Sequence, residues 1–270
     1  MQYDVVTITP EMAASLLQRN DHNRSIKRAN VEFLKKQLKD GQWQLNGESV
    51  KISPSGRLLD GQHRLTACVE SGIPFQTLVV HGVAEESQVT MDTGFVRDFA
   101  NVLQLNGYKN TVNLSVTVRT CYMADTQGVA AAADGSFRKL SNSTLYEYFI
   151  ARDDELLDIC AKALAAYRNY RLISVSTYSL LYKLLKDKDQ SAVEEFFDQV
   201  TQGIGLSKGS PILLLRKEAE KLAGSSYDSH EKRRRLANKM IRAWNKWREQ
   251  GTPVNSLSEY RDLDKAKLSD

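Results

Sequence analysis

Two patterns of hydrophobic and polar positions divide this chain. Up to about residue 110, alternating or β-branched stretches are interleaved with segments that carry apolar residues at helical spacing. Strands are predicted at residues 4–9, 49–52, 57–59 and 75–80, the last of them central in the sheet, and helices after Thr9, from residue 25 or 30 to 39, and from Gln62 to Gly72. This order predicts a compact α/β domain over residues 1–110.

Beyond residue 110 helical spacing dominates. Helices are predicted at residues 111–124, 144–168, 174–186, 191–201, 210–223 and 230–250. Two have start signals: Ser191 with Glu194 three positions later, and Ser210 followed by Pro211. We therefore expect an α+β protein in which an all-helical domain over residues 111–252 follows the α/β domain, with residues 253–270 as a loose tail.

One strand-to-helix junction carries candidate chemistry. The segment from Arg57 passes through Asp60-Gly61 into a helix that opens with Gln62-His63-Arg64. The first amides of a helix lack intrahelical partners and the helix dipole adds positive charge there, so an anion is attracted. With a cation, an imidazole and an open glycine at a solvent-facing helix start, the junction is typical of a phosphate cradle. A simpler interpretation makes Asp60 a helix cap, Gly61 a turn residue and the next side chains solvated.

Composition excludes several classes of protein. The 270 residues are 41% hydrophobic and 26% charged, as in ordinary globular proteins. No apolar run approaches the roughly 20 residues that span a bilayer, and the first residues lack a signal-peptide pattern, so we expect a cytoplasmic protein without membrane contact. Three widely spaced cysteines and four histidines predict neither a disulfide framework nor a zinc or His-rich metal site.

The net charge of +4 is concentrated in one segment. Eight basic residues and no acidic one lie between positions 232 and 248, while the remaining 29 basic and 33 acidic residues carry −4. Like charges without acidic partners repel one another unless a polyanion is present, which favours contact with DNA phosphates. The expected contacts are Arg233, Arg234, Arg235, Lys239 and Arg242. The alternative is a docked helix with a solvated cationic face and an apolar stripe of Leu236, Met240, Trp244 and Trp247.

A second segment with candidate chemistry runs from Met91 to Asp98. Thr93-Gly94 forms a turn whose amides can face an anion, and Arg97 follows one helical turn later. The segment is thus a candidate to close over a nucleotide opposite Arg64. An ordinary helix entry with a solvated Arg97 explains the pattern equally well.

The order of elements and the Asp60-Gly61-Gln62-His63-Arg64 turn resemble the superfamily of ParB N-terminal domains and sulfiredoxins. The signature turn of that superfamily binds nucleotide phosphates, and residues 20–24 resemble its first box, which carries an arginine, here Arg24. The resemblance covers about residues 1–100. The whole chain resembles ParB-like proteins encoded by bacteriophages, which are grouped as ParB-like nuclease domains. Gln62 stands where sulfiredoxins have their reactive cysteine, so sulfinic acid reduction is not expected, and the chain lacks the helix-turn-helix of partitioning ParB proteins.

The resemblance implies a nucleotide such as ATP or CTP with Mg²⁺. Arg64 then clamps the β- or γ-phosphate, assisted by the turn residues Gly61, Gln62 and His63, and His63 is the candidate acid or base. Glu48 and Asp60 are the candidate catalytic carboxylates and metal ligands, although Glu48 is equally well explained as a turn acid.

Three functions stay open at this stage. The first is an Mg²⁺-dependent NTP hydrolase or phosphotransferase that acts on or with DNA. The second is a nucleotide-gated DNA-binding module without turnover. The third is a metal-dependent DNA nuclease, for which Glu48, Asp60 and Asp92 are the nearby carboxylates. The sequence leaves the oligomeric state open.

Overall fold

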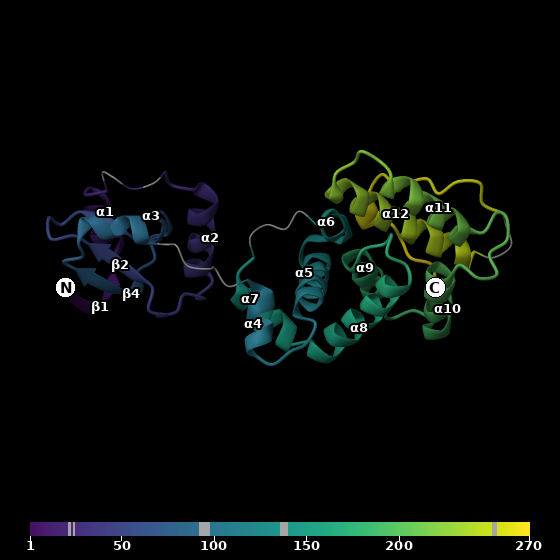
Figure 1. Ribbon diagram of the computed structural model, residues 1–270, viewed down its shortest axis with the longest axis horizontal. Helices are drawn as coiled ribbons and strands as arrows, with labels where there is room; N and C mark the ends of the chain where they lie inside the picture. The colour runs from purple at the N-terminus through teal and green to yellow at the C-terminus, as the bar shows by residue number, and fades with distance from the viewer. Residues whose placement is uncertain (21–22, 24, 92–97, 136–139, 250–252) are drawn as a thin grey trace. The chain divides into compact units, whose positions relative to one another are not determined.

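The chain folds into two compact units. The computed structural model describes residues 1–20, 23, 25–91, 98–135, 140–249 and 253–270. One unit is Met1–Val96 with Lys139–Ser143, and the other is Arg97–Arg138 with Thr144–Asp270 (Figure 1). The first contains a four-stranded sheet, and the described part of the second contains helices but no strand. The chain is therefore α+β.

The sheet of the N-terminal unit has the strand order β1-β4-β2-β3. Its elements follow the sequence in this order: β1 (Gln2–Ile8), α1 (Pro10–Leu17), α2 (Arg28–Lys39), β2 (Ser49–Ile52), β3 (Leu58–Asp60), α3 (Gln62–Ser71), β4 (Phe75–His81) and the 3₁₀ helix η1 (Glu85–Thr90). β4 pairs antiparallel with β1 and parallel with β2, which confirms the predicted inner strand. β2 also pairs antiparallel with β3, with Lys51 opposite Asp60.

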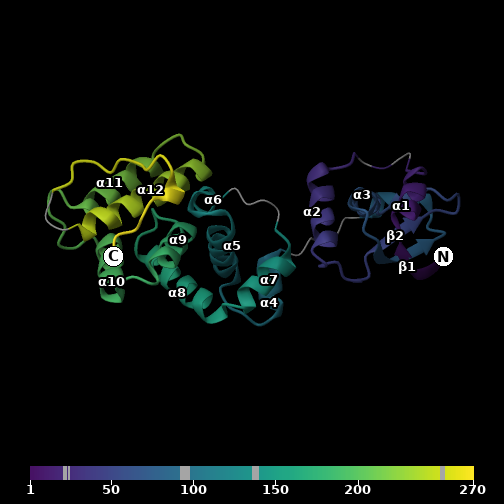
Figure 2. The same cartoon turned by 180° about the vertical axis from the view of Figure 1, so that it is seen from behind.

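The core of this unit lies between the sheet and its three helices (Figure 2). Strand residues such as Ile8, Val50 and Val79 pack with Val31 of α2 and Leu65 of α3, and all of them are nearly inaccessible to solvent. This burial removes the apolar faces of α1, α2 and α3 from water and fixes the start of α3 against the end of β3.

The local start signals of two helices are confirmed, and that of a third is not. Thr9 caps α1, with Pro10 at its first position, and Ser210 caps α11 by accepting a hydrogen bond from the Leu213 amide. The predicted start at Ser191 is wrong, because Asp189 caps that helix and accepts hydrogen bonds from the Ser191 and Ala192 amides. A carboxylate two residues upstream thus replaces the expected hydroxyl.

Helices follow one another along the described part of the chain after residue 110. They are α5 (Thr111–Gln127), α6 (Val129–Asp134), α7 (Asn142–Ile150), α8 (Asp153–Asn169), α9 (Val175–Leu185), α10 (Gln190–Gln202), α11 (Pro211–Ala223) and α12 (Ser229–Arg248). The sequence missed α6 and a further helix that precedes α5, α4 (Phe99–Leu105). The predicted helix at 144–168 is two helices, because the acidic first turn of α8 favours a new helix start at Asp153.

The expected loose tail is wrong for residues 253–270. Leu257 and Leu263 are buried, and Leu263 begins the short 3₁₀ helix η2 (Leu263–Lys265). The Trp244 indole donates to the Ser269 carbonyl at 3.0 Å, and the Ser269 amide donates to Asn245 at 2.8 Å. The segment therefore covers α12 and completes the core of this unit.

Two further expectations concern the membrane and the cysteines. Every helix in the described part of the chain is too short or too polar to cross a bilayer. Cys68, Cys121 and Cys160 are free and buried. Burial raises the pKa of the Cys68 thiol to about 11, so this thiol stays protonated near neutral pH.

Candidate functional site

The turn between β3 and α3 has the geometry of a tight junction against β2. Gly61 is left-handed, with φ +106°, and is the N-cap of α3. A Cβ on Gly61 would lie 2.9 Å from Cγ2 and 3.3 Å from Cα of Val50. The backbone conformation of Gly61 and its packing against β2 therefore require a glycine. The sequence argument expected this glycine for the tight strand-to-helix bend and for the approach of a phosphate, but not for the packing.

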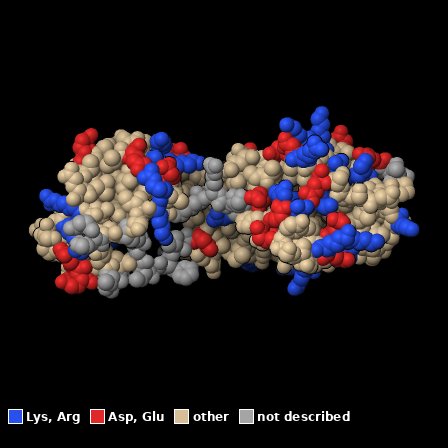
Figure 3. Space-filling view, turned by 90° about the horizontal axis from the view of Figure 1, so that it is seen from above, with Lys and Arg blue, Asp and Glu red and all other residues tan. Residues whose placement is uncertain are grey.

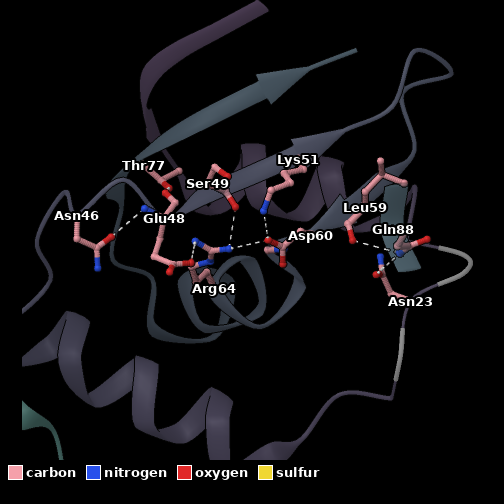
Figure 4. Close-up of polar contacts among 11 residues, drawn as sticks. Asn23, Asn46, Glu48, Ser49, Lys51, Leu59, Asp60, Arg64, Thr77 and Gln88 are labelled. Atoms are coloured by element: carbon pink, nitrogen blue, oxygen red, sulfur yellow. Dashed lines mark hydrogen bonds and ion pairs between the residues drawn. The ribbon is translucent and has the colours of Figure 1, made fainter. Parts of the chain in front are cut away.

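Arg64 is held at the junction by the backbone of β2 and lies between two carboxylates (Figure 4). One terminal nitrogen donates to the Ser49 carbonyl at 2.7 Å, and the guanidinium lies 3.5 Å from carboxylate oxygens of both Glu48 and Asp60. Only 11% of its side chain is exposed, so the expectation of a solvent-facing helix start is wrong here. The backbone of β2 therefore fixes the direction of the guanidinium.

The two candidate carboxylates differ in how firmly they are held. Asp60 accepts from the Lys51 ammonium at 2.7 Å and from the Gly61 amide at 2.7 Å, with 16% of its side chain exposed. Glu48 is 67% exposed and meets Arg64 only at 3.5 Å. Its amide donates to the Asn46 side chain, as a turn residue does. Glu48 thus occupies the position of a turn acid, and its predicted catalytic role stays a prediction.

These residues do not fit a resident Mg²⁺ ion. Lys51 and Arg64 already neutralise Asp60, and Mg²⁺ requires several oxygen ligands in near-octahedral geometry. The described residues contain no group of three acidic, histidine or cysteine side chains arranged to hold a metal. Glu48 and Asp60 therefore act as partners of cations in this structure.

His63 contacts the start of α2. Its Nε2 atom accepts a hydrogen bond from the Lys27 amide at 3.0 Å, which ties α3 to the start of α2. An accepting Nε2 assigns the proton of a neutral ring to Nδ1. The contact supports a structural role for His63 more directly than the predicted role as acid or base.

Sequence reasoning missed an amide network beside the motif. Asn23 donates to the Leu58 carbonyl at 2.7 Å and accepts from Gln88 at 2.9 Å, while Asn20 donates to Gln62 at 3.1 Å. Gln62, predicted to face the nucleotide, is 5% exposed. Asn20 and Asn23 lie in the segment 20–24 that resembles the first box of the superfamily. These two asparagines were the signal from which the network could have been predicted. Lys51 was also missed. The alternation of side chains along β2 places it on the face opposite to that of the buried Val50, so its position could have been predicted.

Several predicted nucleotide contacts lie outside the described residues. They are Arg24, Thr93, Gly94 and Arg97, together with the candidate carboxylate Asp92. Their proposed roles stay predictions.

The basic residues of α12 have partners within their own unit. Arg234 and Arg235 bind Glu231 at 2.8 and 2.6 Å, and Arg235 also binds Glu259 at 3.0 Å. Lys239 binds Glu218 at 3.1 Å. The argument that these charges have no acidic partners is therefore wrong, because Glu231 in the first turn of α12 and the distant Glu218 and Glu259 pair with three of the five predicted residues.

Two other arginines of α12 are engaged through carbonyls and rings. Arg233 donates to the Asp134 carbonyl at 3.4 Å, and Arg242 donates to the Ser258 carbonyl at 3.1 Å and lies 3.8 Å from the ring centre of Tyr260. Basic and acidic side chains are intermixed over the helical unit on the face in Figure 3. The interpretation of α12 as a docked helix is the better supported one, with its apolar stripe at Leu236, Met240 and Trp244 buried.

Comparisons with protein-family models, with curated proteins and with solved structures find no match for this chain. The resemblance to ParB-like and sulfiredoxin domains therefore depends on the motif and on the order of elements.

Proposed function

We propose that the N-terminal unit is a ParB-like nucleotide-binding module that binds the phosphates of a nucleotide such as ATP or CTP at Arg64. The observation that carries the proposal is the way Arg64 is held. A 2.7 Å hydrogen bond to the Ser49 carbonyl orients the guanidinium, whereas both carboxylates stay at 3.5 Å. The protein thus positions the cation firmly and neutralises it loosely.

A phosphate can replace Glu48 at this cation. An exposed ion pair contributes only about 0–1 kcal/mol, whereas a phosphate can accept two parallel hydrogen bonds from a guanidinium. Since 67% of the Glu48 side chain is exposed, it can turn into solvent without leaving a buried charge unpaired. Glu48 is then a competing anion at the site.

The geometry supports binding better than turnover. The carboxylates that would hold Mg²⁺ are paired with cations, and His63 is engaged with the backbone of Lys27. The nucleotide-gated module is therefore favoured over an Mg²⁺-dependent hydrolase, phosphotransferase or nuclease. DNA remains a proposed partner, but the five predicted residues of α12 do not support it.

The test is nucleotide binding by calorimetry, with ATP, CTP, GTP and UTP, with and without Mg²⁺ and DNA. Arg64→Gln should lower the affinity at least tenfold, and Glu48→Gln should raise it severalfold. Glu86→Gln, at an exposed acid of η1, is the matched control and should change nothing. Unchanged affinity in a folded Arg64→Gln variant would refute the proposal, and released phosphate or cut DNA in the same mixtures would replace the binding module with an enzyme.

A further inference from the structure

The helical unit contains a cavity of about 350 Å³. None of the described residues that line it is an arginine of α12. Its walls are the loop between α10 and α11, the last turn of α12, and Pro253. The Val254 amide donates to the Gly209 carbonyl at 2.9 Å, which joins two of these walls. The volume lies in the range of small-molecule sites, about 300–1,000 Å³.

The lining of this cavity is cationic. Lys208 and Lys246 contribute to it, and none of the described residues that line it is acidic. Lys208 is exposed and makes no ion pair or hydrogen bond with any described residue. Lys246 pairs with Glu249, an exposed acid that does not line the cavity. An anion in the cavity would thus meet the Lys208 ammonium, which has no carboxylate partner among the described residues, and the Lys246 ammonium, for which Glu249 competes from outside the cavity lining.

An aromatic wall lies in the same cavity. Trp247 lines it, and its ring is packed at 5.6 Å from the ring of Phe196 and at 5.7 Å from that of Trp244. These contacts fix the indole, while part of its surface stays accessible. A fixed indole is a stacking platform for a flat ring, and nucleobases stack on such side chains at about 1–3 kcal/mol per base.

We infer that this cavity binds a nucleoside phosphate, with the base against Trp247 and the phosphate at Lys208 and Lys246. The inference is independent of the function proposed for Arg64, because the cavity lies wholly in the helical unit. Two sources share this chemistry: a free mononucleotide, and a nucleotide within single-stranded nucleic acid.

The experiment uses the full chain with Arg64→Gln, so that binding at the N-terminal unit does not contribute. AMP, inorganic phosphate and a fluorescein-labelled oligothymidylate of ten residues are titrated separately. We expect AMP or the oligothymidylate to bind, and the double variant Lys208→Gln/Lys246→Gln to weaken that binding at least tenfold. Lys217→Gln, at an exposed lysine of α11 outside the cavity, is the matched control and should leave affinity unchanged.

The three titrations distinguish a free mononucleotide from single-stranded nucleic acid as the ligand. Oligothymidylate binding much tighter than AMP, with a log–log salt slope about 1.4 smaller in the double variant, assigns the site to single-stranded nucleic acid. Equal affinities assign it to a free mononucleotide. Trp247→Leu should weaken the binding of either ligand. If Trp247→Leu does not fold, the affinity of Lys208→Gln/Lys246→Gln alone supports or refutes the inference. Unchanged binding in the double variant, inorganic phosphate that binds as well as AMP, or no binding of AMP or oligothymidylate would overturn the inference.

Discussion

Substitution of Gly61 by alanine separates two explanations of the glycine at the turn before α3. If the glycine serves packing, Gly61→Ala destabilises the N-terminal unit. If it serves only the approach of a phosphate, the variant folds normally and loses nucleotide binding alone. The structure supports the first explanation, because a Cβ would lie 2.9 Å from Val50 Cγ2.

The expected magnitude has two parts. A residue other than glycine in a left-handed conformation costs about 1–2 kcal/mol, and Gly61 has φ +106°. An additional methyl group in a packed core costs about 1–3 kcal/mol, and Val50 is fully buried on an inner strand. Together these give a loss of about 2–5 kcal/mol in the free energy of unfolding.

Gly72 provides the matched control. It has φ +71° at the other end of α3, and a Cβ there would meet nothing within 4 Å. Gly72→Ala should therefore lose only the conformational part, about 1–2 kcal/mol. Native-state hydrogen exchange of α3 and β2 peptides measures these free energies for the N-terminal unit alone.

A double-mutant cycle with Val50→Ala tests the contact itself. The smaller side chain removes Cγ2, so the loss from Gly61→Ala should shrink by about 0.5–3 kcal/mol in that background. The packing argument fails if Gly61→Ala costs no more than Gly72→Ala, or if the cycle shows no coupling.

Three further predictions concern other parts of the chain. Hydrogen bonds from Arg28 and from a lysine of α2 lower the pKa of Glu70 from 4.5 to about 2. Its carboxylate thus stabilises the fold above pH 4.5 and loses this effect as pH falls toward 2, so the melting temperature of Glu70→Gln should fall less steeply over that interval than that of the parent. Ser210→Ala should cost the helical unit about 1 kcal/mol in denaturant unfolding, whereas Ser191→Ala, at a residue that caps nothing, should cost less. Leu263→Ala should cost about 2–5 kcal/mol in the same assay, and a value near zero would mean that the C-terminal segment is loose after all.

Much of the local structure could be predicted from the sequence. Thr9 with Pro10 and Ser210 with Pro211 start helices where expected, since a cap and the first helical amides lie within three residues of each other. The strand at residues 75–80 and the helix that opens with Gln62 were predicted for the same reason, because strand and helix periodicity are local. The strand-to-helix junction that contains the candidate site was predicted, but the contacts within the junction were not.

Those contacts depend on residues that are distant in sequence. Arg64 meets the Ser49 carbonyl only because β2 lies beside β3, and the Cβ position of Gly61 faces Val50 for the same reason. Spacing along one segment gives no information about such neighbours.

The basic segment shows most clearly which properties the sequence determines and which the tertiary structure determines. The sequence by itself determined that α12 is a helix with one apolar stripe and many cations, since composition and periodicity are properties of the segment. Only the tertiary structure decided that Glu218 and Glu259 neutralise two of those cations and that Ser269 covers Trp244. The physical reason is that ion pairs and burial depend on distance in space, and packing of the helical unit sets the distances between residues that are 20 or more positions apart.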